Sequence, residues 1–150
     1  MGDIMIRGVF LDPLLRDAGR PWLLADADTE AVLAHHVHAA FDSASRRNGL
    51  LGRTGLDDEA LILAPCSAIH TFFMRFPIDV IFADRDGRIT RCVPHVRPWR
   101  ITGALRAFAA IALAAGTSAR TGTRRFSRVE LRAAAPAAVD GRPGAAALEG

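Results

Sequence analysis

Short apolar runs separated by glycine, proline and aspartate follow one another along most of the chain, a pattern typical of β-strands joined by tight turns. The clearest runs cover residues 60–64, 69–76 and 78–83. Asp84-Arg-Asp-Gly87 follows the third run and precedes another apolar run, Ile89 to Val93. An Asp-Gly step between two such runs predicts a β-hairpin. We expect Pro94 to end the returning strand, because proline cannot donate a ladder hydrogen bond.

Residues 31–41 fit two patterns. A helix would place Leu33 and Val37 on one stripe. A strand would place the same two residues on one face and His36 and His38 on the other. Elsewhere we expect strands at 22–25 and 125–131, a strand or helix at 107–114, a turn or short helix at 116–123, and a short helix that begins at Asp42 and ends near Gly49.

Strands outnumber helices in this reading, and the sharp turn signals are those of hairpins. The fold class we predict is therefore α+β, with a mainly antiparallel sheet or small open barrel and one or two short helices. The 150 residues fit one domain, which we place at 22–132. Residues 1–21 would form an N-terminal extension. Residues 133–150 are an Ala/Pro/Gly tail with few large apolar side chains, so we expect disorder there.

The composition excludes several classes of protein. No apolar run reaches the ~18 residues of a membrane helix, and residues 4–9 are too short for the core of a secretory signal. Two cysteines, Cys66 and Cys92, do not make a disulfide framework. We therefore expect a cytoplasmic protein with reduced thiols and no membrane partner.

Charge is distributed unevenly along the chain, and every basic residue apart from histidine is arginine. Residues 1–84 carry 7 Arg against 12 acidic residues, whereas residues 85–132 carry 11 Arg against 2. The second segment is either a solvated outer face of the sheet or an electrostatic footprint for an anionic partner.

One stretch has a specific character. Pro65-Cys-Ser-Ala-Ile-His-Thr-Phe-Phe-Met-Arg-Phe-Pro-Ile-Asp-Val-Ile-Phe82 is preceded by Arg46-Arg-Asn-Gly-Leu-Leu-Gly-Arg53 and followed by Pro98-Trp-Arg100 and Ala115-Gly-Thr-Ser-Ala-Arg-Thr-Gly122. Together these segments closely resemble the bacterial and archaeal domain-of-unknown-function family 192, also called uncharacterised protein family 0127. The resemblance covers residues 22–132.

The resemblance implies a compact α+β domain dominated by antiparallel strands, and a strand at residues 31–41. The family has no known reaction or ligand to carry over. This chain departs from the family pattern at Arg124-Arg-Phe-Ser-Arg128, where a Pro-Gly-Asp turn is common. The last hairpin is therefore expected to be looser, and an exposed Phe126 would be unusual.

Asp79 is the most informative polar residue, because it lies within the apolar run Ile78 to Phe82. A buried carboxylate must be hydrogen-bonded or paired. It is either a general base or ligand-binding group, or a structural residue that accepts backbone N–H groups or a guanidinium from Arg75 or Arg100.

His70 shares a strand face with Phe72 and Met74. If the chain turns at Phe76 and Pro77, His70 and Asp79 lie on neighbouring strands, where they could move a proton. The alternative is a structural histidine held by one hydrogen bond.

Cysteine and histidine residues form two further sets of candidate site residues. Cys66 precedes His70 by four residues, but no third residue orients such a pair, and a small buried thiol is the simpler reading. The histidines at 35, 36 and 38 lack the spacing and partners of a metal site, so we predict no metal.

Trp99 stands between Arg97 and Arg100 in a proline-bounded segment. Its ring could stack on a planar or sugar ligand while the guanidinium groups hold an anion. Alternatively, it covers the core.

The function we favour is a non-catalytic small-ligand-binding or accessory domain without a cofactor. It would hold a small polar or anionic ligand, or a protein segment, near His70, Arg75, Asp79, Trp99 and Arg100. One alternative is an enzyme that uses Asp79 and His70 as acid and base. The other is weak nucleic-acid association through the Arg-rich residues 85–132.

Overall fold

The computed structural model describes residues 10–17, 19–40 and 55–134. These residues form two short helices and ten strands: α2 (Asp12–Arg16), β1 (Trp22–Asp26), β2 (Val32–Ala34), β3 (His36–Ala40), β4 (Glu59–Leu63), β5 (Ala68–His70), β6 (Ile78–Ala83), β7 (Ile89–Val96), β8 (Ile101–Gly103), β9 (Ala109–Ala114), α4 (Thr117–Thr121) and β10 (Val129–Ala133). The helix expected after Asp42 and most of the tail expected from residue 133 lie outside the described residues.

The strands form three open sheets with the orders β10-β1-β2, β3-β4-β9-β6-β7 and β5-β8. Every strand pair is antiparallel except β3 with β4, which is parallel. The predicted α+β class with mainly antiparallel strands is therefore confirmed, and the one parallel pair makes the five-stranded sheet mixed.

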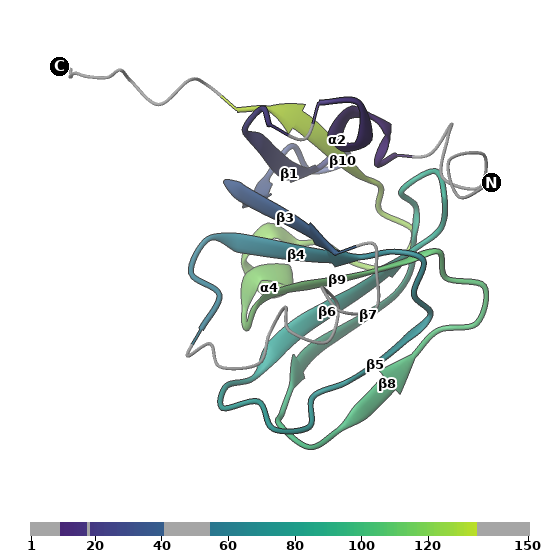
Figure 1. Ribbon diagram of the computed structural model, residues 1–150. Coiled ribbons are helices and arrows are strands. Elements are labelled where there is room, and N and C mark those ends of the chain that lie inside the picture. The colour runs from purple at the N-terminus through teal and green to yellow at the C-terminus, as the bar shows by residue number, and fades with distance from the viewer. Residues whose placement is uncertain (1–9, 18, 41–54, 135–150) are drawn as a thin grey trace, which may run out of the picture.

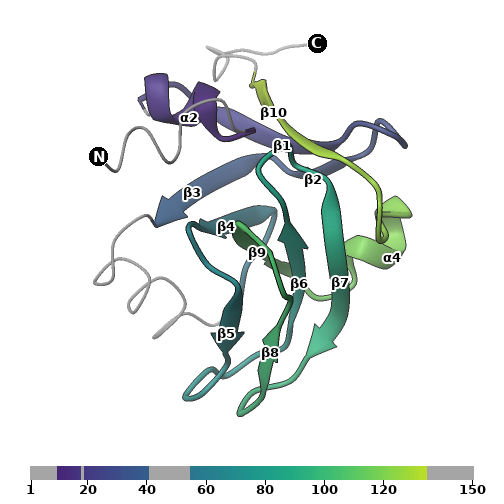
Figure 2. The same cartoon turned by 90° about the vertical axis from the view of Figure 1, so that its right-hand side faces the viewer.

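The sheets follow one another along the molecule (Figure 1). The three-stranded sheet and α2 lie at one end, the five-stranded sheet lies in the middle, and the β5–β8 ribbon extends to the other end. The turned view keeps this order and places α4 beside β7 (Figure 2). The chain thus places the loops around the β5–β8 ribbon far from both α2 and β10.

Strands β6 and β9 lie inside the five-stranded sheet and are buried on both faces. Ile81 and Ile111 belong to one apolar cluster, and Val80 and Phe82 to another. This two-sided burial explains why both strands read as continuous apolar runs rather than alternating ones. Leu11 also joins the first cluster, so the segment before residue 22 contributes to the core.

The two patterns weighed for residues 31–41 are resolved by the structure for residues 32–40. These residues form β2 and β3, and His36 and His38 are both exposed. The strand conformation implied by the family resemblance is confirmed there, but the chain forms two strands in different sheets, separated by His35, instead of one. The spacing of apolar residues favours neither helix nor strand here, because positions i and i+4 share a face with both the helical period of 3.6 residues and the strand period of 2.

Two strand predictions were wrong at their ends. Of the expected strand at 69–76 only Ile69 and His70 are extended, as the end of β5, and the chain then turns. Strand β7 runs through Pro94 to Val96 instead of ending at the proline. It can do so because β7 is an edge strand, where a missing N–H interrupts no ladder on the open side.

The hairpin at Asp84–Gly87 is confirmed and joins β6 to β7. The Asp84 carboxylate accepts the backbone N–H groups of Asp86 at 2.9 Å and Arg88 at 3.0 Å. Gly87 has a φ of +87°, a conformation that a side chain disfavours. Both described helices are five residues long, and none of the described helices could cross a bilayer.

Candidate functional site

Asp79 is fully enclosed in the sheet and is surrounded by hydrogen-bond donors. One carboxylate oxygen accepts the backbone N–H of His95 at 2.9 Å and that of Gly116 at 3.2 Å. The other accepts the N–H of Ser118 at 2.9 Å and its hydroxyl at 2.8 Å. Four donors satisfy this carboxylate, so it ties β6 to β7 and to the beginning of α4.

His70 lies elsewhere. It ends β5, pairs with Ile101 of β8 and is exposed. The expected placement of His70 and Asp79 on neighbouring strands was wrong, because β6 pairs with β7 and β9 while β5 forms a separate ribbon with β8. The turn before Pro77 is longer than a hairpin turn, and this length lets β5 leave the sheet.

His70 instead begins a row of aromatic rings that we call the aromatic tip: His70, Phe72, Phe73 and Trp99. The rings of His70 and Phe72 stack with centroids 4.6 Å apart, and those of Phe72 and Trp99 stack at 5.5 Å. Phe73 meets Trp99 edge to face at 4.6 Å. His70 is the last residue of β5, Phe72 and Phe73 lie in the loop after β5, and Trp99 lies in the loop before β8.

Thr71 holds these two loops together from a fully buried position. Its hydroxyl donates to the carbonyl of Arg97 at 2.6 Å and accepts the N–H of Arg100 at 2.9 Å. Its backbone N–H donates to Arg100 O at 2.8 Å, and its carbonyl accepts the N–H of Trp99 at 3.0 Å. The position of the Trp99 ring is therefore set by one threonine across the loop pair.

Both exposed rings stand on unusual backbone. Phe73 has a φ of +67° and Trp99 a φ of +65°. Bulky residues rarely adopt this left-handed conformation, which costs on the order of 1–3 kcal/mol and tends to occur at binding sites. Here the Thr71 contacts hold the conformation in place.

Four of the five residues expected to bind a ligand lie in this region, and Asp79 does not act there. Arg75 and Arg100 are exposed in the two loops, and the Arg100 guanidinium donates to Trp99 O at 3.3 Å. Sequence reasoning placed Phe72 on a strand face and gave Phe73 no role. The positive φ at Phe73 has no sequence signal, since glycine or asparagine would be the usual residue there.

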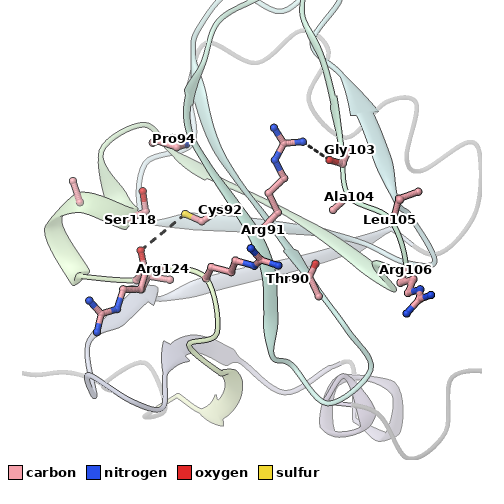
Figure 3. Close-up of a pocket in the computed structure, with 13 residues that line it drawn as sticks. Thr90, Arg91, Cys92, Pro94, Gly103, Ala104, Leu105, Arg106, Ser118 and Arg124 are labelled. Carbon is pink, nitrogen blue, oxygen red and sulfur yellow. Dashed lines mark hydrogen bonds between the residues drawn. The ribbon is translucent and has the colours of Figure 1, made fainter.

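A second region of interest is hollow. A groove of about 950 Å³ lies over β7, between residues 103–106 on one side and residues 118–125 on the other. We call it the arginine groove. Figure 3 shows Cys92 of β7 between Ser118 and Arg124 on one side and Ala104 to Arg106 on the other.

The groove is strongly basic. Arg91, Arg106, Arg124 and Arg125 line it, and none of its 13 lining residues is acidic. Within the described residues none of the four arginines forms an ion pair. Arg91 is fixed by a hydrogen bond of 2.6 Å from its guanidinium to Gly103 O. The arginine-rich stretch seen in the sequence thus converges here from three segments.

Cys92 forms part of the groove floor and is a weak nucleophile. Burial raises the pKa of its thiol above the ordinary value, a hydrogen bond with Ser118 works against this, and the negative charge of Asp79 adds to it. The thiol therefore stays protonated at neutral pH. Cys66 is also free, and its Sγ donates to Ala68 O at 3.1 Å.

Two of the histidines at 35, 36 and 38 pair with acidic side chains. His35 Nδ1 lies 2.9 Å from the Asp58 carboxylate, and His38 Nε2 lies 3.1 Å from Glu59. In the part of the chain that the structure describes, no three His, Cys, Asp or Glu side chains come together as metal ligands.

Comparisons with known proteins support the fold. The chain is similar to a crystallised protein of unknown function from Novosphingobium aromaticivorans, with 24% identity and a TM-score of 0.63 over 73% of this chain and 83% of that one. It is also similar to a candidate transcription regulator from Sinorhizobium meliloti, with 22% identity and a TM-score of 0.62 over 74% and 92%. At these identities the likeness shows a shared fold alone.

Curated protein sequences give no significant match. The family model DUF192, described as "Uncharacterized ACR, COG1430", matches residues 24–131, which include every strand from β2 to β9 and α4. Residues 24–131 are most of the chain, and they carry both the aromatic tip and the arginine groove. The protein therefore belongs to the DUF192 family, whose function is uncharacterised.

Proposed function

We propose that this protein is a non-catalytic binding domain that holds a small organic anion in the arginine groove. The observation that carries the proposal is the convergence of Arg91, Arg106, Arg124 and Arg125 on one hollow with no acidic residue in its lining. A guanidinium presents a planar fork of donors that matches carboxylate and phosphate groups. Unpaired guanidinium groups around a groove attract anions from solution.

The shape of the groove suggests the size and character of the ligand. A volume of about 950 Å³ lies within the ~300–1,000 Å³ of typical small-molecule sites. Pro94, Ala104, Leu105 and Ala119 supply apolar lining between the cationic groups. A ligand with two or more anionic groups on a partly apolar frame would satisfy both features.

Binding is favoured over catalysis because the groups that chemistry would need are held inactive. The Asp79 carboxylate is enclosed and already accepts four hydrogen bonds, so it cannot reach a ligand. The raised pKa of Cys92 disfavours the thiolate that nucleophilic catalysis requires.

The test is isothermal titration calorimetry with citrate and pyrophosphate as probes, on the wild type and on the double variant Arg106→Ala/Arg124→Ala. Both side chains are exposed, so the variant should keep the wild-type melting temperature. We expect at least ten-fold weaker binding. Arg97→Ala is the matched control, since Arg97 is an exposed arginine outside the groove. Equal weakening in the control, or no binding of either probe, would contradict the proposal.

A second candidate is a long polyanion, favoured by the 11 Arg in residues 85–132. Salt dependence separates the two. If several arginines neutralise phosphates of duplex DNA, the logarithm of the binding constant falls with the logarithm of the salt concentration, with a slope of about −0.9 per phosphate contact. A salt slope of several units with duplex DNA, together with no response to citrate or pyrophosphate, would favour nucleic acid over the small anion.

A further inference from the structure

The aromatic tip projects large apolar side chains into solvent at the far end of the molecule. Phe73 is 68% exposed, Trp99 is 55% exposed, and the adjacent Ile101 is 71% exposed. Phe73 lies in the loop between β5 and β6, Trp99 lies in the loop between β7 and β8, and Ile101 is the first residue of β8. These two loops lie at the end of the molecule opposite α2 (Figures 1 and 2). Clustered exposed groups of this size mark a surface that meets a partner.

The charge around the tip has one sign. Arg75, Arg97 and Arg100 are exposed in the same two loops, and the exposed His70 and His95 lie at the ends of β5 and β7 that lead into these loops. Over residues 66–83 and 93–108 the sole acidic residue is Asp79, which is enclosed and satisfied by its donors. The two loops therefore carry exposed arginines and no exposed acidic residue, a charge that fits an anionic partner.

The tip also has a fixed shape before any partner arrives. The buried Thr71 joins the two loops through Arg97 and Arg100, and the positive φ angles aim Phe73 and Trp99 outward. Strained backbone that keeps apolar rings in water has no benefit for the stability of the isolated domain.

We propose that the aromatic tip docks onto an anionic lipid surface. Trp99 and Phe73 would enter the interface between headgroups and acyl chains, where aromatic rings are favoured. Arg75, Arg97 and Arg100 would lie against the lipid phosphates, since basic groups next to an anionic membrane gain electrostatic attraction. The absence of a spanning segment in the sequence does not bear on this contact, because peripheral docking requires none.

Size and shape favour a lipid surface over a protein. A stable protein interface buries about 800 Å² per partner through roughly 20–30 residues. The aromatic tip and Ile101 belong to two short loops, residues 71–77 and 97–100, and to the ends of β5 and β8 next to them, and they contribute nothing to the lining of the arginine groove. A few projecting side chains are enough to enter a bilayer interface, which adapts its shape to them.

The ring geometry favours lipid over single-stranded nucleic acid. A base needs an open aromatic face. Here Phe72 stacks against His70 and Trp99, so one face of the Trp99 ring is covered by Phe72, and Phe73 meets Trp99 edge to face. The most exposed of the three large apolar side chains, Ile101, has no ring to stack on a base.

Vesicle binding tests the proposal. The probes are vesicles of phosphatidylcholine alone and of phosphatidylcholine mixed with phosphatidylglycerol. In a Trp22→Phe background Trp99 is the one remaining tryptophan. We expect co-sedimentation and a blue shift of Trp99 emission with the anionic vesicles, and at least ten-fold weaker binding to the neutral ones.

The double variant Phe73→Ser/Ile101→Ser should bind anionic vesicles at least ten-fold more weakly while the melting temperature holds, because both side chains are already exposed. Phe126→Ser is the matched control, since Phe126 is 60% exposed away from the tip. Three results would overturn the proposal: unchanged Trp99 emission with anionic vesicles, equal weakening in the control, or binding of a single-stranded oligonucleotide with none to vesicles.

Discussion

Asp79 and Ser118 are 39 residues apart in the sequence and are joined by two hydrogen bonds, one from the Ser118 backbone N–H at 2.9 Å and one from its hydroxyl at 2.8 Å. These two hydrogen bonds connect α4 to β6. The hydrogen bonds from His95 and Gly116 complete the set of donors around the same carboxylate. Asp79 is therefore the point at which the sheet, its edge strand and α4 are held together.

Replacement of Asp79 by asparagine should destabilise the protein strongly. The amide keeps one acceptor oxygen and points its N–H groups at donors. At least one backbone N–H then loses its partner, and two do if the amide nitrogen replaces the oxygen that His95 and Gly116 bind. We expect a loss of about 2–4 kcal/mol in the free energy of unfolding, which lowers the melting temperature by about 8 °C or more.

Asp57→Asn is the control for this measurement, because Asp57 is exposed and its substitution removes the same formal charge as Asp79→Asn. Its melting temperature should stay close to that of the wild type. If Asp79→Asn unfolded no earlier than Asp57→Asn, the four hydrogen bonds would not stabilise the fold.

Thr71→Val tests whether one hydroxyl holds the loop pair. Valine keeps the shape of the side chain but leaves Arg97 O and the Arg100 N–H without the partner that the hydroxyl gave them. We expect a loss of about 1–3 kcal/mol in the free energy of unfolding. In a Trp22→Phe background the emission of Trp99 should also change, because its loop loses its fixed position.

Thr102→Val is the matched control, since Thr102 lies in β8 of the same ribbon and its hydroxyl makes no hydrogen bond to the described residues. Thermal unfolding and Trp99 emission should stay as in the wild type. Similar changes in both variants would mean that any valine in the ribbon perturbs it, and that Thr71 has no special role.

Local sequence pattern predicts β6 well, because Ile78–Ala83 is an apolar run typical of a sheet covered on both faces. Ala109–Ala114 is a similar run, but strand and helix stayed open there, because periodicity alone does not separate a buried strand from a buried helix. The Asp84–Gly87 turn is equally local, because its chemistry depends on four adjacent residues.

The strand ends and the sites depend on contacts that are distant in sequence. Pro94 is tolerated because β7 is an edge strand, and the pairing of β5 with β8 draws His70 away from Asp79. The arginine groove gathers side chains from β7, the segment after β8 and the segment after α4. An excess of arginine was visible in the sequence, but its convergence on one hollow was not.

Asp26 also makes a contact that is distant in sequence. The sequence marks it only as the start of a polar turn, and its carboxylate does accept the N–H groups of Asp28 and Thr29. Its second oxygen also accepts the hydroxyl of Thr123, 97 residues away, at 2.8 Å. No periodicity can predict such a bond, because it requires β1 and the end of α4 to be placed first.

Gly87→Ala tests the hairpin that the sequence predicts. Gly87 has a φ of +87°, and a Cβ at this position would overlap the carbonyl oxygen of Val129. Both effects oppose alanine, so we expect a loss of more than about 1 kcal/mol in the free energy of unfolding. Gly19→Ala is the control, because a Cβ there meets nothing within 4 Å. Equal stability of the two variants in urea denaturation would show that the turn tolerates a side chain.

The raised pKa of Cys92 predicts how stability depends on pH in the alkaline range. The chain has no tyrosine and no lysine, so its two cysteines are the side chains that titrate between about pH 8 and 11. Burial and the charge of Asp79 hold the pKa of Cys92 above the ordinary value of 9.0 in the folded protein. The unfolded chain therefore ionises this thiol first as the pH rises.

The sign of the effect follows from proton binding. Above pH 9.0 the folded state of a Cys66→Ser variant keeps a proton on Cys92 that the unfolded state has lost, so stability should fall with rising pH until the folded thiol also ionises. Cys66→Ser/Cys92→Ser lacks both titrating thiols and should show a flatter dependence of stability on pH in urea denaturation between pH 8 and 11.

Alkylation of Cys92 by iodoacetamide is a second measurement. In Cys66→Ser the alkylation rate should reach its midpoint above pH 9.0 in the native protein and near pH 9.0 in denaturant. The contrary outcome is parallel stability profiles together with a native alkylation midpoint at or below pH 9.0. It would mean that the Cys92 thiol is open to solvent and to the charge of the surrounding arginines, and is more reactive than its burial indicates.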